Sequence, residues 1–190
     1  MMNIKSNSKR VGKLPDFWPS KFYSEIPTDL KNWVIEQYFN QQCMSIYCDA
    51  SVKQDQQVIV VACSYVANNF IQVKQQYVQP LQFHKPIPPM YAEMKSIIFA
   101  LKHFEKHIGQ CTEAIIYSDV NDIERILGDE PLFKKNPALQ KTRSELKMLH
   151  DNKLVTTNIK LSIEYLPVER KRYNPFYKSA HNAAYRLIRS

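Results

Sequence analysis

Three acidic residues stand where carboxylates are uncommon in a folded chain. Asp49 lies inside the apolar stretch IYCDAS, Glu93 lies in the first turn of an expected helix, and Asp119 directly follows the apolar stretch AIIYS. Each has a structural explanation on its own, because an acid can cap a turn or a helix and can complement a helix dipole. If the strands beside Asp49 and Asp119 are neighbours, however, a connecting helix can bring Glu93 to the same point.

Three converging carboxylates would favour a bound cation. They repel one another, so their pKa values rise unless positive charge is held between them. Carboxylate oxygens are hard ligands that suit Mg²⁺ or Mn²⁺. Two such ions can hold the attacking and the leaving oxygens of a phosphodiester. The three acids therefore point to metal-dependent chemistry on a phosphate ester.

The hydrophobic pattern predicts the elements that would position these acids. Asn68-Asn69 predicts a tight turn between two strands, because asparagine tolerates positive φ. Apolar residues spaced by three and four predict a long helix that Gly109 ends. The predicted strands are 43–51, 57–66, 70–79, 114–118 and 159–166, and the predicted helices are 28–40, 90–108, 121–127, 137–150 and 179–188. A hairpin meander followed by alternating helices and strands implies an α/β fold, with a mixed sheet covered by helices.

Length and composition fit one globular domain with room for an extension. The chain has 190 residues, of which 44% are hydrophobic and 23% are charged. The first part of the chain carries Pro15, Pro19 and Pro27 among scattered aromatic residues and shows a helical period only near its end. We therefore expect an N-terminal extension with one amphipathic helix at 1–42 and the main domain at 43–190.

Residue counts argue against several classes of protein. The three glycines leave no glycine-rich loop for a P-loop or a dinucleotide-binding fold. The four cysteines form no CxxC pair or Cys/His cluster, which favours buried free thiols over a zinc site or disulfides. No apolar run approaches the roughly 18 residues of a membrane span, and no apolar stretch follows the charged N-terminus as it would in a secretory signal. We expect a cytoplasmic protein without a membrane contact that acts as a monomer.

Positive charge gathers near the C-terminus. The formal net charge is +8, and residues 169–190 hold six basic side chains against one acidic one. The basic residues are Arg170, Lys171, Arg172, Lys178, Arg186 and Arg189. Such a cluster suits a polyanion such as nucleic acid, although a solubilising surface would have the same composition.

Four motifs, in order, resemble the ribonuclease H family, type 1. They are IYCDAS in the first strand, YAEMKSIIFAL in the first helix of the domain, IIYSDVNDI after the fourth strand and SAHNAAYRLI in the last helix. The resemblance covers about residues 43–190. It implies a five-stranded mixed sheet of order 3-2-1-4-5 with the acids at its centre. It also implies that two divalent ions, Mg²⁺ or Mn²⁺, cleave the RNA strand of an RNA–DNA hybrid and leave 5′-phosphate and 3′-hydroxyl ends.

The resemblance further implies roles for individual residues. Asp49 would bind both ions, Glu93 would bind one ion and orient the attacking water or the ribose 2′-hydroxyl, and Asp119 would bind the ion on the water side. His181 takes the fourth position, where the family usually has Asp, as a metal ligand or proton carrier. Asn121 would read the minor groove. The basic residues near His181 would hold phosphates of the hybrid; they are Arg170, Lys171, Arg172 and Lys178.

The chain departs from the family pattern in two further places. Ala50 replaces the usual glycine after Asp49, and the segment VERKRYNPFYKS lacks the histidine and glycine that the family commonly has before the last helix. Two alternatives therefore stay open beside hybrid cleavage. The same fold could cut DNA or structured RNA, or it could be a degenerate module that binds nucleic acid or a protein without cutting.

Overall fold

A computed structural model describes residues 15–79 and 86–190 of the chain. Five strands form one mixed sheet in the order β3-β2-β1-β4-β5, which confirms the predicted fold class. The strands are β1 Cys43–Lys53, β2 Val58–Ala67, β3 Phe70–Val78, β4 Glu113–Ser118 and β5 Lys160–Tyr165. The helices are η1 Ser20–Glu25, α1 Thr28–Phe39, α2 Pro89–His103, η2 Phe104–Lys106, α3 Ile123–Leu127, α4 Pro137–Thr156, α5 Val168–Lys171 and α6 Pro175–Leu187.

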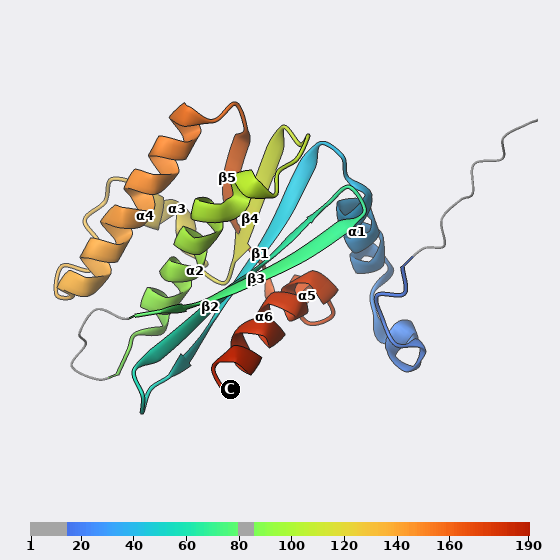
Figure 1. The fold of residues 1–190 in the computed structure, drawn as a ribbon, viewed down its shortest axis with the longest axis horizontal. Coiled ribbons are helices and arrows are strands. Elements are labelled where there is room, and N and C mark those ends of the chain that lie inside the picture. The colour runs from blue at the N-terminus through green and yellow to red at the C-terminus, as the bar shows by residue number, and fades with distance from the viewer. Residues whose placement is uncertain (1–14, 80–85) are drawn as a thin grey trace, which may run out of the picture.

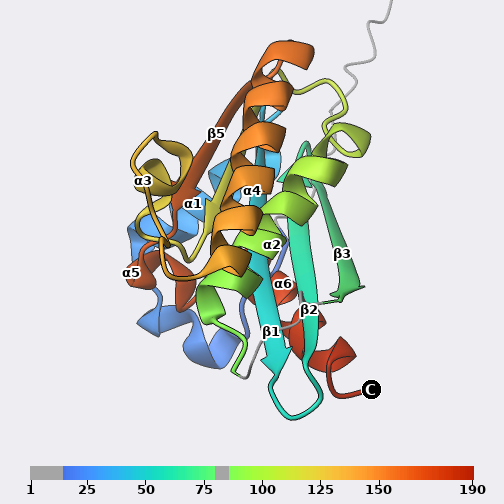
Figure 2. The ribbon, with the colours of Figure 1, turned by 90° about the vertical axis from the view of Figure 1, so that its left-hand side faces the viewer.

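Helices cover both faces of the sheet. Figure 1 shows α2 and α4 on one face and α6 and α1 on the other, and the turned view in Figure 2 shows the same layers. Side chains of β2, which lies between β3 and β1, alternate accordingly: Ile59, Val61 and Cys63 lie in the core beneath α2, whereas Val60 and Ala62 pack against α6. The continuous apolar run of β2 thus reflects burial on both faces.

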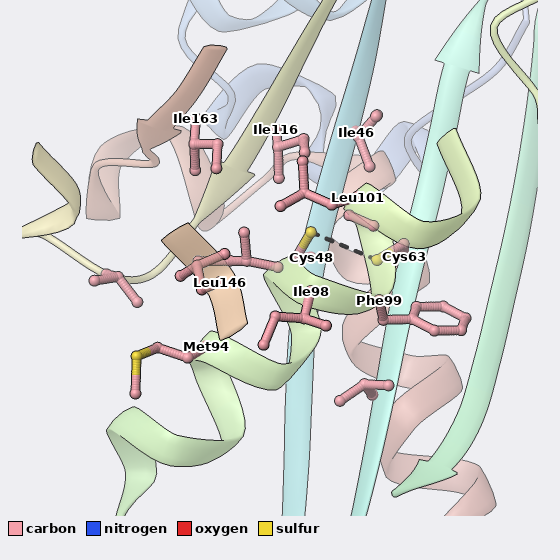
Figure 3. Close-up of a cluster of buried hydrophobic side chains, with 14 of the residues drawn as sticks. Ile46, Cys48, Cys63, Met94, Ile98, Phe99, Leu101, Ile116, Leu146 and Ile163 are labelled. Atoms are coloured by element: carbon pink, nitrogen blue, oxygen red, sulfur yellow. Dashed lines mark hydrogen bonds between the residues drawn. The ribbon is translucent and has the colours of Figure 1, made fainter. Parts of the chain in front are cut away.

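The core beneath α2 is almost wholly apolar. Figure 3 shows its centre, where side chains of α2, α4 and three strands meet: Ile46, Ile98, Leu101, Ile116, Leu146 and Ile163. Cys48 and Cys63 face each other from paired positions on β1 and β2, with their Sγ atoms 3.5 Å apart. All four cysteines are free thiols, as the sequence predicts.

The strand register brings two of the acids together. β1 pairs with β4 in parallel, with Tyr47 opposite Tyr117. Asp49 lies two residues beyond Tyr47, and Asp119 lies two residues beyond Tyr117, just after β4 ends. Because residues two apart on a strand share a face, Asp49 points with Tyr47 toward the face that α6 covers.

The segment before β1 packs on the same face as α6. Leu30 and Val34 of α1 are buried together with Tyr47 and Phe176, and the indole nitrogen of Trp18 donates a hydrogen bond of 2.6 Å to the backbone oxygen of Tyr173. The first 14 residues of the predicted extension lie outside the described residues. The division of the chain at residue 42 stays a prediction.

Two predicted boundaries of the domain helices were wrong. α2 ends at His103, and the 3₁₀ turn Phe104–Lys106 follows it, so Gly109 (φ 57°) belongs to the next loop and does not cap the helix. α6 begins at Pro175 and not at residue 179. The Asn174 side chain accepts hydrogen bonds from the first backbone N–H groups, which starts the helix one turn earlier.

Other expectations fared differently. Asn68 and Asn69 both have positive φ, 48° and 63°, which confirms the predicted turn. The alternating sequence of β3 would by itself indicate one exposed face, yet most of its side chains on both faces are exposed, because β3 forms the edge of the sheet. The short helices η1 and α5 were not predicted, and α4 runs to Thr156. Among the described residues, no helix combines the length and apolar character needed to cross a membrane.

Candidate active site

Asp49 and Asp119 share one hydroxyl group. The Tyr177 hydroxyl lies 3.1 Å from Asp49 Oδ1 and 3.3 Å from Asp119 Oδ2, so it can donate to either carboxylate. His181 Nδ1 lies 3.1 Å from the other oxygen of Asp49, Oδ2. Both oxygens of Asp49, which is 4% exposed, therefore have partners on α6.

Burial disturbs the ionisation of Asp49. The loss of water raises the pKa of the Asp49 carboxyl, and the negative charge of Asp119 raises it further. His181 and the Tyr177 hydroxyl act in the opposite direction. Burial raises the pKa of the Tyr177 hydroxyl, and the charges of Asp49 and Asp119 raise it further. The hydroxyl therefore stays protonated and remains a donor.

Glu93 reaches the same acids from the opposite layer of the molecule. It is the fifth residue of α2, just past the first turn that was expected to hold it, because Pro88 and Pro89 set the start of the helix one residue earlier. Its Oε2 is buried and has no hydrogen-bond partner among the described residues. Burial, followed by the charges of Asp49 and Asp119, raises the pKa of Glu93 from 4.5 to about 8. A carboxylate in this setting is poised to accept a cation.

Lys171 supplies a positive charge to this acid cluster. Its Nζ lies 2.8 Å from Asp119 Oδ1, and the lysine side chain is only 18% exposed. The contact is an ion pair without hydrogen-bond geometry, so Asp119 Oδ1 is still without a hydrogen-bonding partner. The charge of Lys171 also lowers the pKa of Glu93. Lys171 was predicted to hold substrate phosphates, a role that stays a prediction.

Tyr177 is the residue of this cluster that the sequence analysis missed. The predicted helix 179–188 does not include Tyr177. The Asn174-Pro175 pair is a recognisable helix start, with a capping side chain and a proline in the first turn. Reading it would have placed Tyr177 four residues before His181, on the same helical face.

The remaining predicted substrate residues lie apart from the acids or make other contacts. Asn121 is exposed. Arg170 lies 3.7 Å from Asp29 and over the ring of Trp33, so it ties α5 to α1. Arg172 and Lys178 lie over the ring of Tyr173, 5.1 and 5.5 Å from its centroid. Both line a pocket of about 330 Å³ whose other walls are Trp18, Pro19, Phe22, Glu25, Ile26 and Tyr173.

The donor set suits a divalent cation, but the side chains are not arranged around one. Nowhere in residues 15–79 and 86–190 do three or more His, Cys, Asp or Glu side chains form a group that could hold a metal ion as they stand. Lys171 and Tyr177 occupy oxygens of Asp49 and Asp119 instead. The Oε2 atom of Glu93 nevertheless fits a hard cation, because it is buried and lacks a hydrogen-bond donor.

Comparison with known proteins gives structural matches alone. No protein-family model and no curated protein matches the chain by sequence. The chain is similar to ribonuclease H1 from the halophilic archaeon Halobacterium salinarum NRC-1, with 16% identity, a TM-score of 0.52, and coverage of 76% of this chain and 98% of that one. It is also similar to LC11-RNase H1 isolated from compost, with 15% identity, a TM-score of 0.57, and coverage of 79% and 100%.

A third solved structure agrees with these two. The N-terminal RNase H domain of rv2228c from Mycobacterium tuberculosis, solved as a fusion with maltose binding protein, has 18% identity and a TM-score of 0.51, with coverage of 78% of this chain and 99% of that one. Identities this low speak only for the path of the backbone. Together with the strand order 3-2-1-4-5, they show that the chain has a ribonuclease H-like fold.

Proposed function

We propose that this chain is a divalent-metal-dependent nuclease that cleaves the RNA strand of RNA–DNA hybrids and leaves 5′-phosphate and 3′-hydroxyl ends. The observation that supports the proposal is the buried Oε2 of Glu93, which has no hydrogen-bond partner among the described residues although the charges of Asp49 and Asp119 act on this carboxyl. A buried carboxylate without a partner costs several kcal/mol in free energy, and a bound cation would offset that cost. The names of the structural neighbours, all ribonucleases H, support the choice of substrate.

Asp49, Glu93 and Asp119 would hold Mg²⁺ or Mn²⁺, with His181 as a fourth candidate ligand. When bound, a divalent ion supplies Lewis-acid charge that stabilises the phosphate and activates water. The number of ions, two by resemblance, stays a prediction.

The chain's own side chains would then position the substrate and its protons. His181, with Nδ1 at 3.1 Å from Asp49, would hold or pass a proton beside that carboxylate. The Tyr177 hydroxyl would keep Asp49 and Asp119 at a fixed separation. Arg172 and Lys178, on the rim of the aromatic pocket, would contact phosphates of the hybrid outside the cleavage point.

Cleavage of a labelled hybrid in Mg²⁺ and in Mn²⁺ tests the proposal, with single-stranded RNA, duplex DNA and structured RNA alongside. We expect Asp49→Asn to lower the rate of hybrid cleavage by about 10³-fold, because a metal ligand and its charge are lost at once. Asp55→Asn is the matched control, since Asp55 is an exposed acid in the turn after β1. Equal loss in both variants, or cleavage that Asp49→Asn leaves unchanged, would contradict the proposal.

One observation favours a second candidate, a module that binds nucleic acid without cutting it. The carboxylates of Asp49 and Asp119 already contact Lys171, Tyr177 and His181, as in a structural polar network. That candidate predicts hybrid binding by the wild-type protein with no cleavage of any of the four substrates in either metal. Glu93 speaks against this second candidate, because a binding module without a metal would leave its buried Oε2 without a partner.

A further inference from the structure

The ammonium group of Lys171 lies in a seat formed by Asp119, Tyr165 and Tyr177. One side of the seat is Asp119, whose Oδ1 is 2.8 Å from Lys171 Nζ. Two aromatic rings form its walls, because Nζ lies 5.8 Å from the ring centroids of both Tyr165 and Tyr177. Aromatic faces attract cations, so carboxylate and rings together hold the ammonium group where it is.

The seat is fixed by the elements around it. Lys171 ends the short helix α5, which follows β5 directly, and Tyr165 is the last residue of that strand. Tyr177 comes from α6, three residues after its N-cap Asn174. Residues of β5 and α6 therefore flank the lysine, and its side chain is mostly buried, at 18% exposure.

The charges of the cluster favour one divalent ion in place of two. Asp49, Glu93 and Asp119 carry three negative charges when all are ionised, and Lys171 supplies one positive charge to Asp119 and Glu93. The remaining charge of minus two is matched by a single divalent ion. A second ion would need the oxygen of Asp119 that faces Lys171 and would meet the ammonium group at close range.

We propose, as a refinement that rests on the proposed function, that Lys171 is the second cation of the acid site, so that this site takes one divalent ion. Asp49 and Glu93 would be the main ligands of that ion. The ammonium group would remain beside Asp119 and stabilise negative charge on the substrate phosphate there. Lysine suits this position, since its head is a compact point charge on a long stem.

Counting bound Mn²⁺ tests this inference without any activity measurement. Electron paramagnetic resonance of free Mn²⁺ in titrations of the purified protein gives the number of ions per chain. We expect one ion for the wild type and for Lys171→Arg, which keeps the charge. Lys171→Met should take two ions, and its first ion should bind about tenfold more tightly because a repelling charge is gone.

Lys153→Met is the matched control. Lys153, on α4, is as buried as Lys171, at 15% exposure. It also pairs with a carboxylate, that of Glu105 in η2. This control should keep one ion. Circular dichroism and thermal unfolding of each variant establish that the fold is intact, and a wild-type count of two would overturn the inference even if Lys171→Met does not fold.

The failure of this inference can be told apart from failure of the proposed function. Two ions in the wild type, or an unchanged count of one in Lys171→Met, would overturn the role of Lys171 while leaving the nuclease proposal standing if Asp49→Asn still abolishes cleavage. A wild type that binds no Mn²⁺ at millimolar concentration would overturn both proposals.

Discussion

The two faces of the sheet are built from different chemistry, although the same strands serve both. Along β1, side chains beneath α2 alternate with side chains beneath α6: Met44, Ile46 and Cys48 against Ser45, Tyr47 and Asp49. The α2 face is closed by apolar packing that is mostly aliphatic, with a few aromatic side chains such as Phe99 and Phe104. The α6 face holds stacked aromatic rings, such as Tyr47 on Tyr117 with centroids 5.1 Å apart, and the hydroxyl, imidazole and ammonium groups of the acid site.

This difference separates stability from function within one layer of backbone. Burial of apolar surface beneath α2 gives a driving force that depends on no particular hydrogen bond. Buried polar groups on the α6 face need partners, and Ser64 Oγ, Asn174 Nδ2 and Asp119 Oδ1 have no hydrogen-bonding one among the described residues. Glu93 is the exception that joins the two, because it starts on the helix of the apolar face and ends among the acids.

The largest effect on folding should follow from a change on the α2 face. Leu101 is fully buried between α2 and the sheet (Figure 3), so Leu101→Ala should lower the free energy of unfolding by about 3 kcal/mol through lost burial and a cavity. Urea unfolding measures this, with the exposed Val155→Ala as control at under about 0.5 kcal/mol. Hybrid cleavage per folded molecule should not change. A drop in that quantity would show that the two faces are not separate.

A smaller and opposite effect is expected where the faces meet. Because the pKa of Glu93 is about 8 in the folded chain against 4.5 ordinarily, its contribution to stability is full below pH 4.5 and is lost as the pH rises through 8. The change in pKa corresponds to about 5 kcal/mol, and burying an amide without partners costs about 3 kcal/mol of that. Glu93→Gln should therefore stabilise the metal-free protein by about 2 kcal/mol above pH 8, with little effect at pH 5.

Thermal unfolding in EDTA at the two pH values measures the effect of Glu93→Gln. Added Mg²⁺ should then stabilise the wild type more than the variant, because the ion compensates only a charged carboxylate. Glu145→Gln is a suitable control, since Lys95 and Lys102 lower the pKa of that carboxyl, and its loss should destabilise the protein. Destabilisation by Glu93→Gln at high pH would mean that Glu93 is a satisfied structural group.

The sequence predicts the fold better than it predicts the site. Alternation and helical spacing follow burial, so the strands and the main helices could be predicted from the pattern. The strand order 3-2-1-4-5 was implied by the resemblance. The acids could be foreseen because carboxylates in apolar stretches are conspicuous. The side chains that contact these acids are less evident from the sequence. Tyr177 and Lys171 belong to a stretch of charged and aromatic residues in which composition alone does not say which side chain points inward.

The positions of Arg170 and Arg172 illustrate the same limit. The two residues lie in one basic stretch, yet Arg170 pairs with Asp29 on α1 whereas Arg172 lines the aromatic pocket. A charge count treats them alike. Because the two residues are two apart along the helical turn of α5, they point to different sides, Arg170 toward α1 and Arg172 toward the pocket.

The smallest expected effect concerns that surface. Arg172→Ala and Lys178→Ala should each weaken hybrid binding about fivefold and reduce its dependence on salt concentration by about one released counterion, since each removes one phosphate contact. Fluorescence anisotropy of a labelled hybrid in Ca²⁺ across a salt series measures both quantities. Lys160→Ala is the control, because Lys160 starts β5 at the end of the sheet away from the acids and is 80% exposed. If all three variants weaken binding alike, the positive charge acts diffusely, and the aromatic pocket beside α6 has no separate part in holding the substrate.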